Sequence, residues 1–294
     1  MKIIVTGSLG NIGLPLTKNL VAAGHQVIVV SSRADKASAI QQLGAEAAIG
    51  SVSDAAFLTN LFTGADAVWA MTPPNMGGSN VIKNTVNAGR AYAEAIKSSG
   101  VKRVVMLSSI GADLPSGTGP IESVHHIENI YRELDGVNIT FLRAGYFYTN
   151  FYNDVPLIKS AGIMGGNFAA HTQVPLAHPE DIATIAAEEL QQPGNGKNVR
   201  YVVSEVRQPA EVAAAVGTAI GNPALQWVEF TNEQSLQGMT QAGVPQEIAA
   251  LYTELGAALH DGRLNGDFIK SGSPLAGKVK LEAFAQEFAG KFVG

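Results

Sequence analysis

Short apolar runs alternate with longer helix-like segments through the first half of the chain, a pattern typical of repeated βαβ units. Most of the apolar runs are continuous stretches of Val, Ile and Leu without period-two alternation. We therefore expect strands that are buried on both faces of a parallel sheet. The predicted strands are Lys2 to Val5, Gln26 to Val30, Ala45 to Ile49, Ala67 to Met71, Arg103 to Leu107 and Asn138 to Leu142.

Helices are expected in the intervals between these strands. Several of them are followed by a glycine, the residue that most easily takes the left-handed conformation at a helix end. The predicted helices are Leu14 to Ala23, Ala34 to Leu43, Ala55 to Phe62, Ser79 to Ser99 and Ser123 to Asp135. Strands and helices in this order predict an α/β fold, a doubly wound parallel sheet of the Rossmann type.

The alternation changes after Asn150. Further helices are expected at Asp154 to Ala161, Pro179 to Gln192, Pro209 to Ile220, Glu233 to Ala242 and Gln246 to Ala258, and strands at Val199 to Val203 and Leu225 to Phe230. We interpret residues 1–150 as a dinucleotide-binding domain, joined by about 178–205. Residues 151–177 and 206–294 are then a smaller, mostly helical lobe that binds the substrate over the carboxyl edge of the sheet.

Composition narrows the class of protein. Of the 294 residues, 46% are hydrophobic and 15% charged, as in a globular protein. The net charge of −5 argues against a nucleic-acid partner, and without cysteine there is no disulfide or thiolate chemistry. The first apolar run is too short for a signal peptide, and glycine, proline or charge interrupts each later one. We expect a soluble, cytoplasmic protein with no membrane contact.

A glycine-rich loop follows the first predicted strand directly and opens the first predicted helix. Three glycines spaced three apart suit a tight turn, close approach of backbone to a pyrophosphate, and close packing of helix on strand. The helix N-terminus adds free N–H groups and the positive end of the helix dipole. The loop residues predicted to hold a dinucleotide are Gly7, Ser8, Leu9, Gly10, Asn11, Ile12 and Gly13.

The end of the second strand predicts which dinucleotide binds. An NAD site carries an acid there to hold the ribose 2′-hydroxyl, and this strand runs instead into Ser31, Ser32 and Arg33. Arg33, Lys36 and the serine hydroxyls offer a cationic pocket for a 2′-phosphate, which predicts NADP(H). The alternative is that Arg33 and Lys36 are solvated residues at a helix start.

With the loop and Arg33 in view, together with Ser108-Ser109 and the stretch from Arg143 to Asn150, the chain resembles the NmrA-like branch of the atypical short-chain dehydrogenase/reductases. The resemblance covers nearly the whole chain and is strongest to members of the NAD(P)H-quinone oxidoreductase type. It implies two-electron reduction of a quinone or a related small acceptor by NADPH. Other members of the family are NADP-sensing regulators that bind a protein partner, so that alternative stays open.

The resemblance also implies roles for residues beyond the glycine loop. Arg33 and Lys36 would hold the 2′-phosphate, and residues after the fourth and fifth strands and after Ala144 would surround the ribose and nicotinamide. The residues of this second group are Met71, Thr72, Pro73, Pro74, Ser108, Ser109, Gly145, Tyr146 and Phe147.

The helix after the fifth strand departs from the Tyr-x-x-x-Lys pair that short-chain dehydrogenases generally use. Glu122 falls at the tyrosine position and His126 at the lysine position. Loss of the tyrosine fits a quinone better than an ordinary carbonyl, because the reduced oxygen is a stabilised phenolate. The spacing of four residues lets Glu122 orient the His126 imidazole, so both are candidate catalytic residues, with a structural histidine as the alternative.

Two further features leave alternatives open. Tyr148 and Phe151 belong to an aromatic run that suits the wall of an acceptor pocket, although core packing explains such a run as well. The apolar positions of Gln246 to Leu264 suit core packing or a homodimer face. No His-x-x-x-His or carboxylate cluster accompanies the histidines, so no metal is expected.

Overall fold

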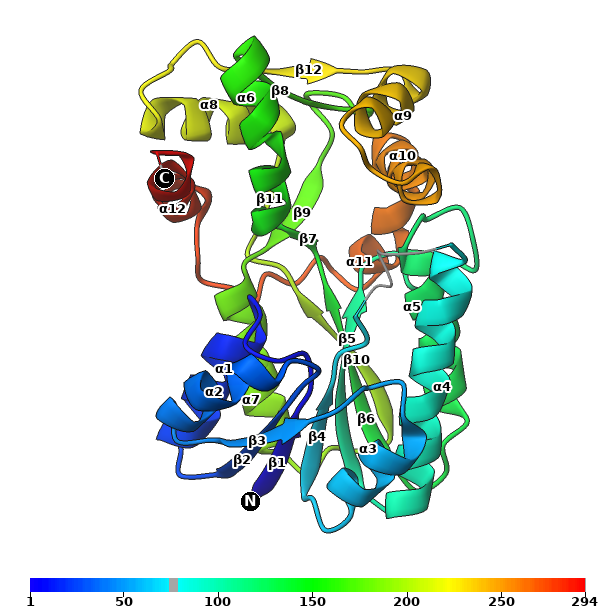
Figure 1. The fold of residues 1–294 in the computed structure, drawn as a ribbon. Helices are drawn as coiled ribbons and strands as arrows, with labels where there is room; N and C mark the ends of the chain where they lie inside the picture. The colour runs from blue at the N-terminus through cyan, green and yellow to red at the C-terminus, as the bar shows by residue number, and fades with distance from the viewer. Residues whose placement is uncertain (74–78, 294) are drawn as a thin grey trace.

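A computed structural model describes residues 1–73 and 79–293. Its centre is a seven-stranded sheet with the order β10-β6-β5-β4-β1-β2-β3, and every neighbouring pair of strands is parallel (Figure 1). The strands are β1 (Lys2–Val5), β2 (Gln26–Ser31), β3 (Glu46–Ile49), β4 (Ala67–Ala70), β5 (Arg103–Ser109), β6 (Asn138–Ala144) and β10 (Lys197–Val202).

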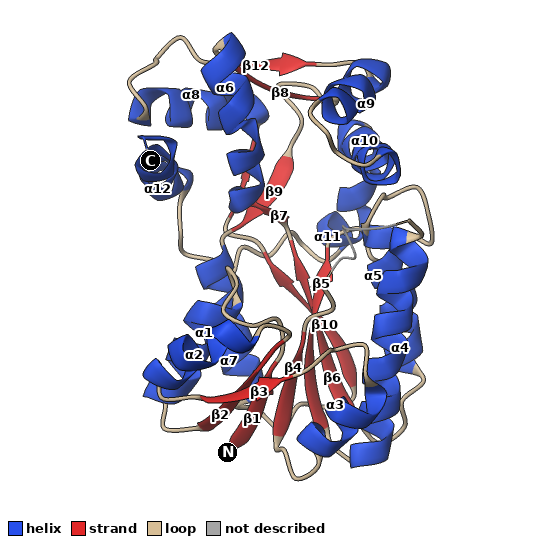
Figure 2. Cartoon of the chain, in the orientation of Figure 1, coloured by secondary structure: helices blue, strands red, loops and turns tan. Residues whose placement is uncertain are grey.

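Helices cover both faces of this sheet because its strands are apolar on both sides (Figure 2). In β1, Ile3 and Val5 enter one core and Ile4 enters the other, as the alternation of side chains along a strand requires. The first face carries α1 (Gly13–Ala22), α2 (Ala37–Gln42) and α7 (Pro179–Leu190); the second carries α3 (Ala55–Phe62), α4 (Val81–Ser99) and α5 (Ile121–Arg132).

A second, mostly helical region lies beyond the carboxyl ends of the strands (Figures 1 and 2). It has its own aromatic core, which includes Phe151, Trp227 and Phe284. Its helices are α6 (Val155–Ala161), α8 (Pro209–Ala219), α9 (Asn232–Gln241), α10 (Gln246–His260), α11 (Gly266–Lys270) and α12 (Leu281–Val293). Two small sheets join them, of order β11-β9-β7 and β12-β8, from β7 (Tyr146–Phe147), β8 (Ile163–Gly166), β9 (Val174–Ala177), β11 (Glu205–Arg207) and β12 (Gln226–Glu229).

The predicted fold class, a doubly wound parallel sheet with a smaller helical lobe, is confirmed, and several details differ. The helix expected at Ala34 to Leu43 is a short 3₁₀ turn, η1 (Ala34–Lys36), followed by α2. The sequence predicts β12, within Leu225 to Phe230, but not α11, α12 or the strands β7, β8, β9 and β11. The division of the chain into domains stays a prediction. No helix among residues 1–73 and 79–293 is long and apolar enough to span a membrane.

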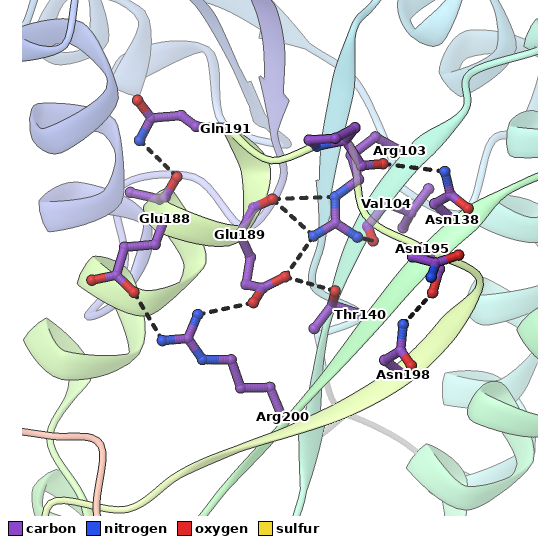
Figure 3. A network of polar contacts seen from close by, with 12 residues as sticks. Arg103, Val104, Asn138, Thr140, Glu188, Glu189, Gln191, Asn195, Asn198 and Arg200 are labelled. Carbon is purple, nitrogen blue, oxygen red and sulfur yellow. Dashed lines mark hydrogen bonds and ion pairs between the residues drawn. The ribbon is translucent and has the colours of Figure 1, made fainter.

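A buried ion pair fastens α7 to the central strands (Figure 3). Arg103 at the start of β5 is only 4% exposed, and its Nη2 lies 2.6 Å from Glu189 Oε2 on α7. Thr140 on β6 donates to the same oxygen, and Arg200 on β10 donates to Glu189 Oε1. Burial alone would raise the pKa of Glu189, but these hydrogen bonds and the charge of Arg103 outweigh it and lower the pKa. The carboxylate therefore joins one helix to three strands.

Replacing Glu189 by alanine leaves the Arg103 guanidinium buried without its carboxylate, while Arg103 keeps its bonds to the Glu189 carbonyl. We expect a loss of about 3 kcal/mol in the free energy of unfolding, measured by urea denaturation at pH 7. Glu188→Ala is the control, because Glu188 is 56% exposed in its pair with Arg200 and should cost less than about 1 kcal/mol. Since the folded pKa is lowered, the gap between wild type and Glu189→Ala should narrow as the pH falls below 4.5. Equal losses in the two variants would contradict this account.

Candidate functional site

The candidate site lies at the carboxyl edge of the sheet, where ligands bind in open α/β sheets. Gly7, Met71, Ser109 and Gly145 stand at the ends of β1, β4, β5 and β6, four strands that are adjacent in the sheet. The fold therefore brings together residues that lie far apart in the sequence. Pro74, another predicted cofactor residue, lies outside the described residues.

Each glycine of the loop has a different steric environment. Gly7 has a φ of +95°, and a Cβ there would lie 2.4 Å from Met71 Cε. A Cβ on Gly13 would lie 2.0 Å from the Ser8 carbonyl oxygen, so α1 can begin this close to the turn at Ser8 only without a side chain at Gly13. A Cβ on Gly10 would meet only the Gly7 oxygen, at 3.5 Å. Space in front of Gly10 is what close approach of a ligand requires.

The backbone of the loop also offers free donors. Ser8, with a φ of 56°, donates its N–H to the Val30 carbonyl. The N–H groups of residues 9–13 donate to no atom of the described residues. They stand at the N-terminus of α1, where the helix dipole favours negative charge. A turn with free N–H groups, no side chain at Gly10 and a helix dipole behind it fits a pyrophosphate.

Thr6 holds the ends of β1 and β4 together beside this loop. Its Oγ1 donates to the Trp69 carbonyl at 2.9 Å and accepts from the Met71 N–H at 2.9 Å. Tyr92 on α4 donates its hydroxyl to the Met71 carbonyl. Burial raises the pKa of Tyr92, so the hydroxyl stays protonated and can donate. These hydrogen bonds hold the backbone of Met71 in place, and Met71 is the first of the predicted cofactor residues Met71, Thr72 and Pro73.

An acid that the sequence pattern did not predict, Asp35 in η1, lies just beyond the end of β2. Arg33 pairs with Asp35, with Nε 3.0 Å from Oδ1 and Nη2 2.5 Å from Oδ2. The side chains are 67% and 59% exposed, so water screens the pair, and Arg33 can exchange Asp35 for another anion. Ser31 Oγ bonds to Ser8 Oγ at 3.1 Å and to the Arg33 backbone, which links this segment to the glycine loop. Ser32 and Lys36 are exposed or half-buried beside the pair.

Ser108 belongs to a buried ionic network. Its Oγ donates to Glu128 on α5 at 2.5 Å, and Arg143 on β6 donates to the same carboxylate through Nε and Nη2. Burial acts to lower the pKa of Arg143, but the hydrogen bonds and charge of Glu128 outweigh it and raise that pKa. The Ser109 hydroxyl instead donates to the Ile110 carbonyl. Ser108 therefore has a structural partner, whereas Ser109 ends half-buried at the sheet edge.

The same network reaches the lobe. Arg143 Nη1 donates to Asp267 Oδ2 on α11 at 2.7 Å, and the Tyr201 hydroxyl on β10 bonds to the same oxygen. Arg132 completes the set, with Nη2 3.0 Å from Glu128 Oε2. A buried arginine thus shares its donors between a helix that covers the sheet and a helix of the lobe.

The structure does not bring His126 to the strand ends. Glu128, two residues further on, faces Ser108, and two residues on an α-helix are turned about 200° apart. His126 instead lines a cavity of about 760 Å³ between α4 and α5. Its Nε2 lies 3.9 Å from Glu122 Oε1, so the expected pairing of the two candidates is loose. His125, not His126, contacts the loop after β5, through its Nδ1 and the Ala112 carbonyl at 2.8 Å.

The aromatic run after β6 divides between two environments. Tyr148 and Phe151 are 0% and 1% exposed and pack in the core of the lobe, which is the alternative that the sequence left open. The Tyr148 hydroxyl donates to Glu205 at 2.8 Å. Tyr146 and Phe147 are half-buried and follow Gly145, where a Cβ would lie 2.5 Å from the Pro175 oxygen. Tyr146 and Phe147 are therefore the members of the run nearest to the strand ends.

A carboxylate from the lobe caps α4. Glu247 in the first turn of α10 accepts from the N–H groups of Asn80 at 2.7 Å and Val81 at 2.6 Å. Asn80 is in the left-handed region, with a φ of 61°. Because α4 follows the segment that leaves β4, this contact ties the lobe to a helix that borders the candidate site.

Replacing Glu247 by alanine removes the acceptor from two N–H groups at a helix start. We expect a loss of roughly 1 to 2 kcal/mol in the free energy of unfolding, measured by urea denaturation. The neighbouring Gln246→Ala is the control, because Gln246 is exposed and its side chain bonds to none of the described residues. A Glu247→Ala protein as stable as Gln246→Ala would show that the cap contributes nothing.

Comparison with known proteins places this geometry in a family. Residues 1–278 match the model of the NmrA-like family. The chain is 29% identical to an NAD(P)H azoreductase of Xenophilus azovorans over 257 residues, which are 86% of this chain and 85% of that protein. It is also 29% identical over 227 residues to a (4-alkanoyl-5-oxo-2,5-dihydrofuran-3-yl)methyl phosphate reductase of Streptomyces griseus, covering 75% of this chain and 74% of the relative.

Solved structures share the fold at lower identity. The triphenylmethane reductase of Citrobacter sp. in complex with NADP(H) has a TM-score of 0.81 and 19% identity, over 97% of this chain and 99% of that one. An NADPH-dependent quinone oxidoreductase of Escherichia coli in complex with NADPH has a TM-score of 0.77 and 18% identity, over 97% and 99% of the two chains. The sheet, its glycine loop and the match over residues 1–278 together show that the chain belongs to the NmrA-like family.

Proposed function

We propose that this protein is an NADPH-dependent reductase that reduces a quinone or a related small acceptor by hydride transfer. The observation that carries the proposal is the turn at Gly10, with free N–H groups from residue 9 to residue 13 and no side chain in front of it. The azoreductase relative is similar over most of both chains and is named for NAD(P)H, which supports a nicotinamide cofactor and an acceptor with a conjugated π system.

In this proposal the residues of the sheet edge bind and orient the cofactor, which supplies the hydride when bound. The N–H groups of residues 9–13 hold the pyrophosphate at the N-terminus of α1. Arg33, Lys36 and Ser32 hold the 2′-phosphate. The ribose and nicotinamide are held by residues at the ends of β4, β5 and β6: Met71, Thr72, Pro73, Ser109, Gly145, Tyr146 and Phe147. Ser108 supports this edge through Glu128.

A catalytic role for His126 and Glu122 stays a prediction that the geometry does not favour, because both lie on the outer side of α5. The cavity that His126 lines contains Lys83, Asn87 and Arg90 of α4 and none of the strand-end residues. Positioning of cofactor and acceptor by the sheet edge therefore carries more of the proposed mechanism than His126 does.

Continuous assays of NADPH oxidation test the proposal directly. Purified protein is mixed with NADPH and a panel of benzoquinones, naphthoquinones and azo dyes, and the loss of absorbance at the nicotinamide band is followed. We expect turnover with at least one class of acceptor. Tight NADPH binding without oxidation by any acceptor would instead favour an NADP-sensing protein that binds a protein partner.

Cofactor preference depends on Arg33 and on its exposed partner. Arg33→Ala should weaken NADPH binding by about 10- to 150-fold, because a hydrogen bond to a charged group contributes roughly 1.5 to 3 kcal/mol. Asp35→Asn should tighten NADPH binding, because Arg33 no longer exchanges a carboxylate for the 2′-phosphate. Binding of both cofactors is measured by calorimetric titration. NADH binding is the control and should change little in both variants. Equal effects on NADPH and NADH would refute the assignment of Arg33.

Pyrophosphate binding depends on the empty space at Gly10. Gly10→Ala keeps the fold, because its Cβ has only an ordinary contact with the Gly7 oxygen at 3.5 Å. The methyl group enters the space for the ligand, so both NADPH and NADH should bind at least about 10-fold more weakly, or about 1.4 kcal/mol. Gly238→Ala in α9 is the control, since nothing lies within 4 Å of its Cβ. Unchanged binding in a folded Gly10→Ala protein would place the pyrophosphate elsewhere.

A further inference from the structure

The cavity between α4 and α5 gathers positively charged side chains. Its volume of about 760 Å³ is in the range of small-molecule sites, and it is lined by Lys83 and Arg90 of α4 together with His126 of α5. The two helices pack side by side on the same face of the sheet, away from the glycine loop (Figure 1). The chain as a whole has a net charge of −5, so this positive charge is a local feature. A hollow lined in this way attracts anions.

Arg90 differs from every other arginine of the chain. Each of the others pairs with at least one carboxylate: Arg33, Arg103, Arg132, Arg143, Arg200, Arg207 and Arg263. Arg90 pairs with no carboxylate among residues 1–73 and 79–293. Glu94 lies four residues further along α4, a spacing that permits an ion pair, yet Arg90 lines the cavity instead. Its guanidinium is therefore available to a ligand.

Arg90 shares one side of α4 with a second cation. Lys83, Asn87 and Arg90 are spaced by four and three residues, so they lie on the same side of the helix, and all three line the cavity. Lys83, like Arg90, has no carboxylate partner in the part of the chain that the structure describes. The helical rise places the two backbones about 10 Å apart along the axis. Two cations at this separation suit two anionic groups of one ligand.

The acid that lines the cavity is already engaged. Glu247 of α10 accepts from the Val81 N–H through Oε1 and from the Asn80 N–H through Oε2. Glu122, on the same helix as His126, approaches the His126 Nε2 only to 3.9 Å. Neither carboxylate forms an ion pair with Lys83 or Arg90. The two cations of α4 therefore remain uncompensated.

The rest of the lining includes an apolar surface. Ile82 and Val86 come from α4, and Ile130 comes from α5. The two helices can pack closely because a Cβ on Gly89 would lie 2.5 Å from the Ile127 Cγ1 atom, so only glycine fits there. Apolar side chains beside unpaired cations favour a ligand that combines hydrocarbon with charge.

We propose that this cavity binds a small organic molecule with two anionic groups on an apolar body. Lys83 and Arg90 hold the anionic groups, which are carboxylates, sulfonates or phosphates, because both cations bind anionic oxygen. The apolar side chains of α4 and α5 contact the body of the ligand. The site is separate from the strand ends, so the inference goes beyond the proposed function and does not depend on it.

Calorimetric titration of the full chain with naphthalene disulfonate, at pH 7 and low ionic strength, tests this site. We expect one saturable site per chain, with weaker binding of naphthalene monosulfonate. Lys83→Gln and Arg90→Gln should each weaken binding of the disulfonate about 3-fold or more, and the double variant about 10-fold or more, because each substitution removes one contact between exposed charges. Both positions are exposed, so an unchanged Tm should accompany the loss.

Two matched controls separate this cavity from other positive charge. Lys97→Gln removes an exposed cation from the same helix outside the cavity lining and should leave the affinity for the disulfonate unchanged. Arg33→Ala removes the predicted 2′-phosphate contact and should also leave it unchanged, because the probe binds elsewhere. Acetylation of wild type by acetic anhydride gives a readout without any substitution. The disulfonate should make Lys83 lose most of its reactivity, measured by mass spectrometry, while Lys97 reacts as before.

Several results would overturn the inference. Titration without a saturable site for the disulfonate would show that the cavity does not bind such anions. Equal weakening by Lys97→Gln and Arg90→Gln, or equal protection of Lys83 and Lys97, would show only attraction to surface charge. Loss of binding in Arg33→Ala with no change in Arg90→Gln would place the probe in the cofactor pocket. None of these measurements involves NADPH oxidation, so failure of the proposed function would leave their outcome unchanged.

Discussion

The close approach of α1 to the ends of β1 and β2 is the constraint on which the candidate site depends. Gly13 lies against the Ser8 carbonyl with no room for a Cβ, and Ser8 bonds to Val30 and to Ser31. The turn is therefore held by both strands, and its N–H groups from residue 9 to residue 13 stay without an acceptor among the described residues. Donors that stay free at a helix N-terminus are preorganised to bind an anion. Less conformational entropy is therefore lost when the anion binds.

Two buried arginines hold helices against the other strands of the sheet. Arg103, at the amino end of β5, fixes α7 through Glu189, and Arg143, at the carboxyl end of β6, fixes α5 and α11 through Glu128 and Asp267. A buried charge that loses its partner is strongly destabilising. Any other position of these helices would separate an arginine from its carboxylate and is therefore disfavoured. The lobe is thereby positioned over the same edge of the sheet that carries the glycine loop.

The sequence predicts most of the fold because continuous apolar strands and glycine-terminated helices are local signals. It predicts the glycine loop for the same reason. It does not predict α12, although Leu281, Phe284 and Phe288 recur at helical spacing, or the strands β7, β8, β9 and β11, which only tertiary pairing stabilises. The orientation of His126 and the burial of Tyr148 are also non-local, since neighbours distant in the chain determine them.

Hydrogen exchange at the glycine loop tests the central claim most directly. The amides of residues 9–13 donate to no atom of the described protein, so they should exchange freely without ligand. Addition of saturating NADPH should protect these five amides, with a smaller effect near Arg33 when NADH is used instead. Protection by NADPH elsewhere in the chain, with the amides of residues 9–13 unchanged, would contradict the account.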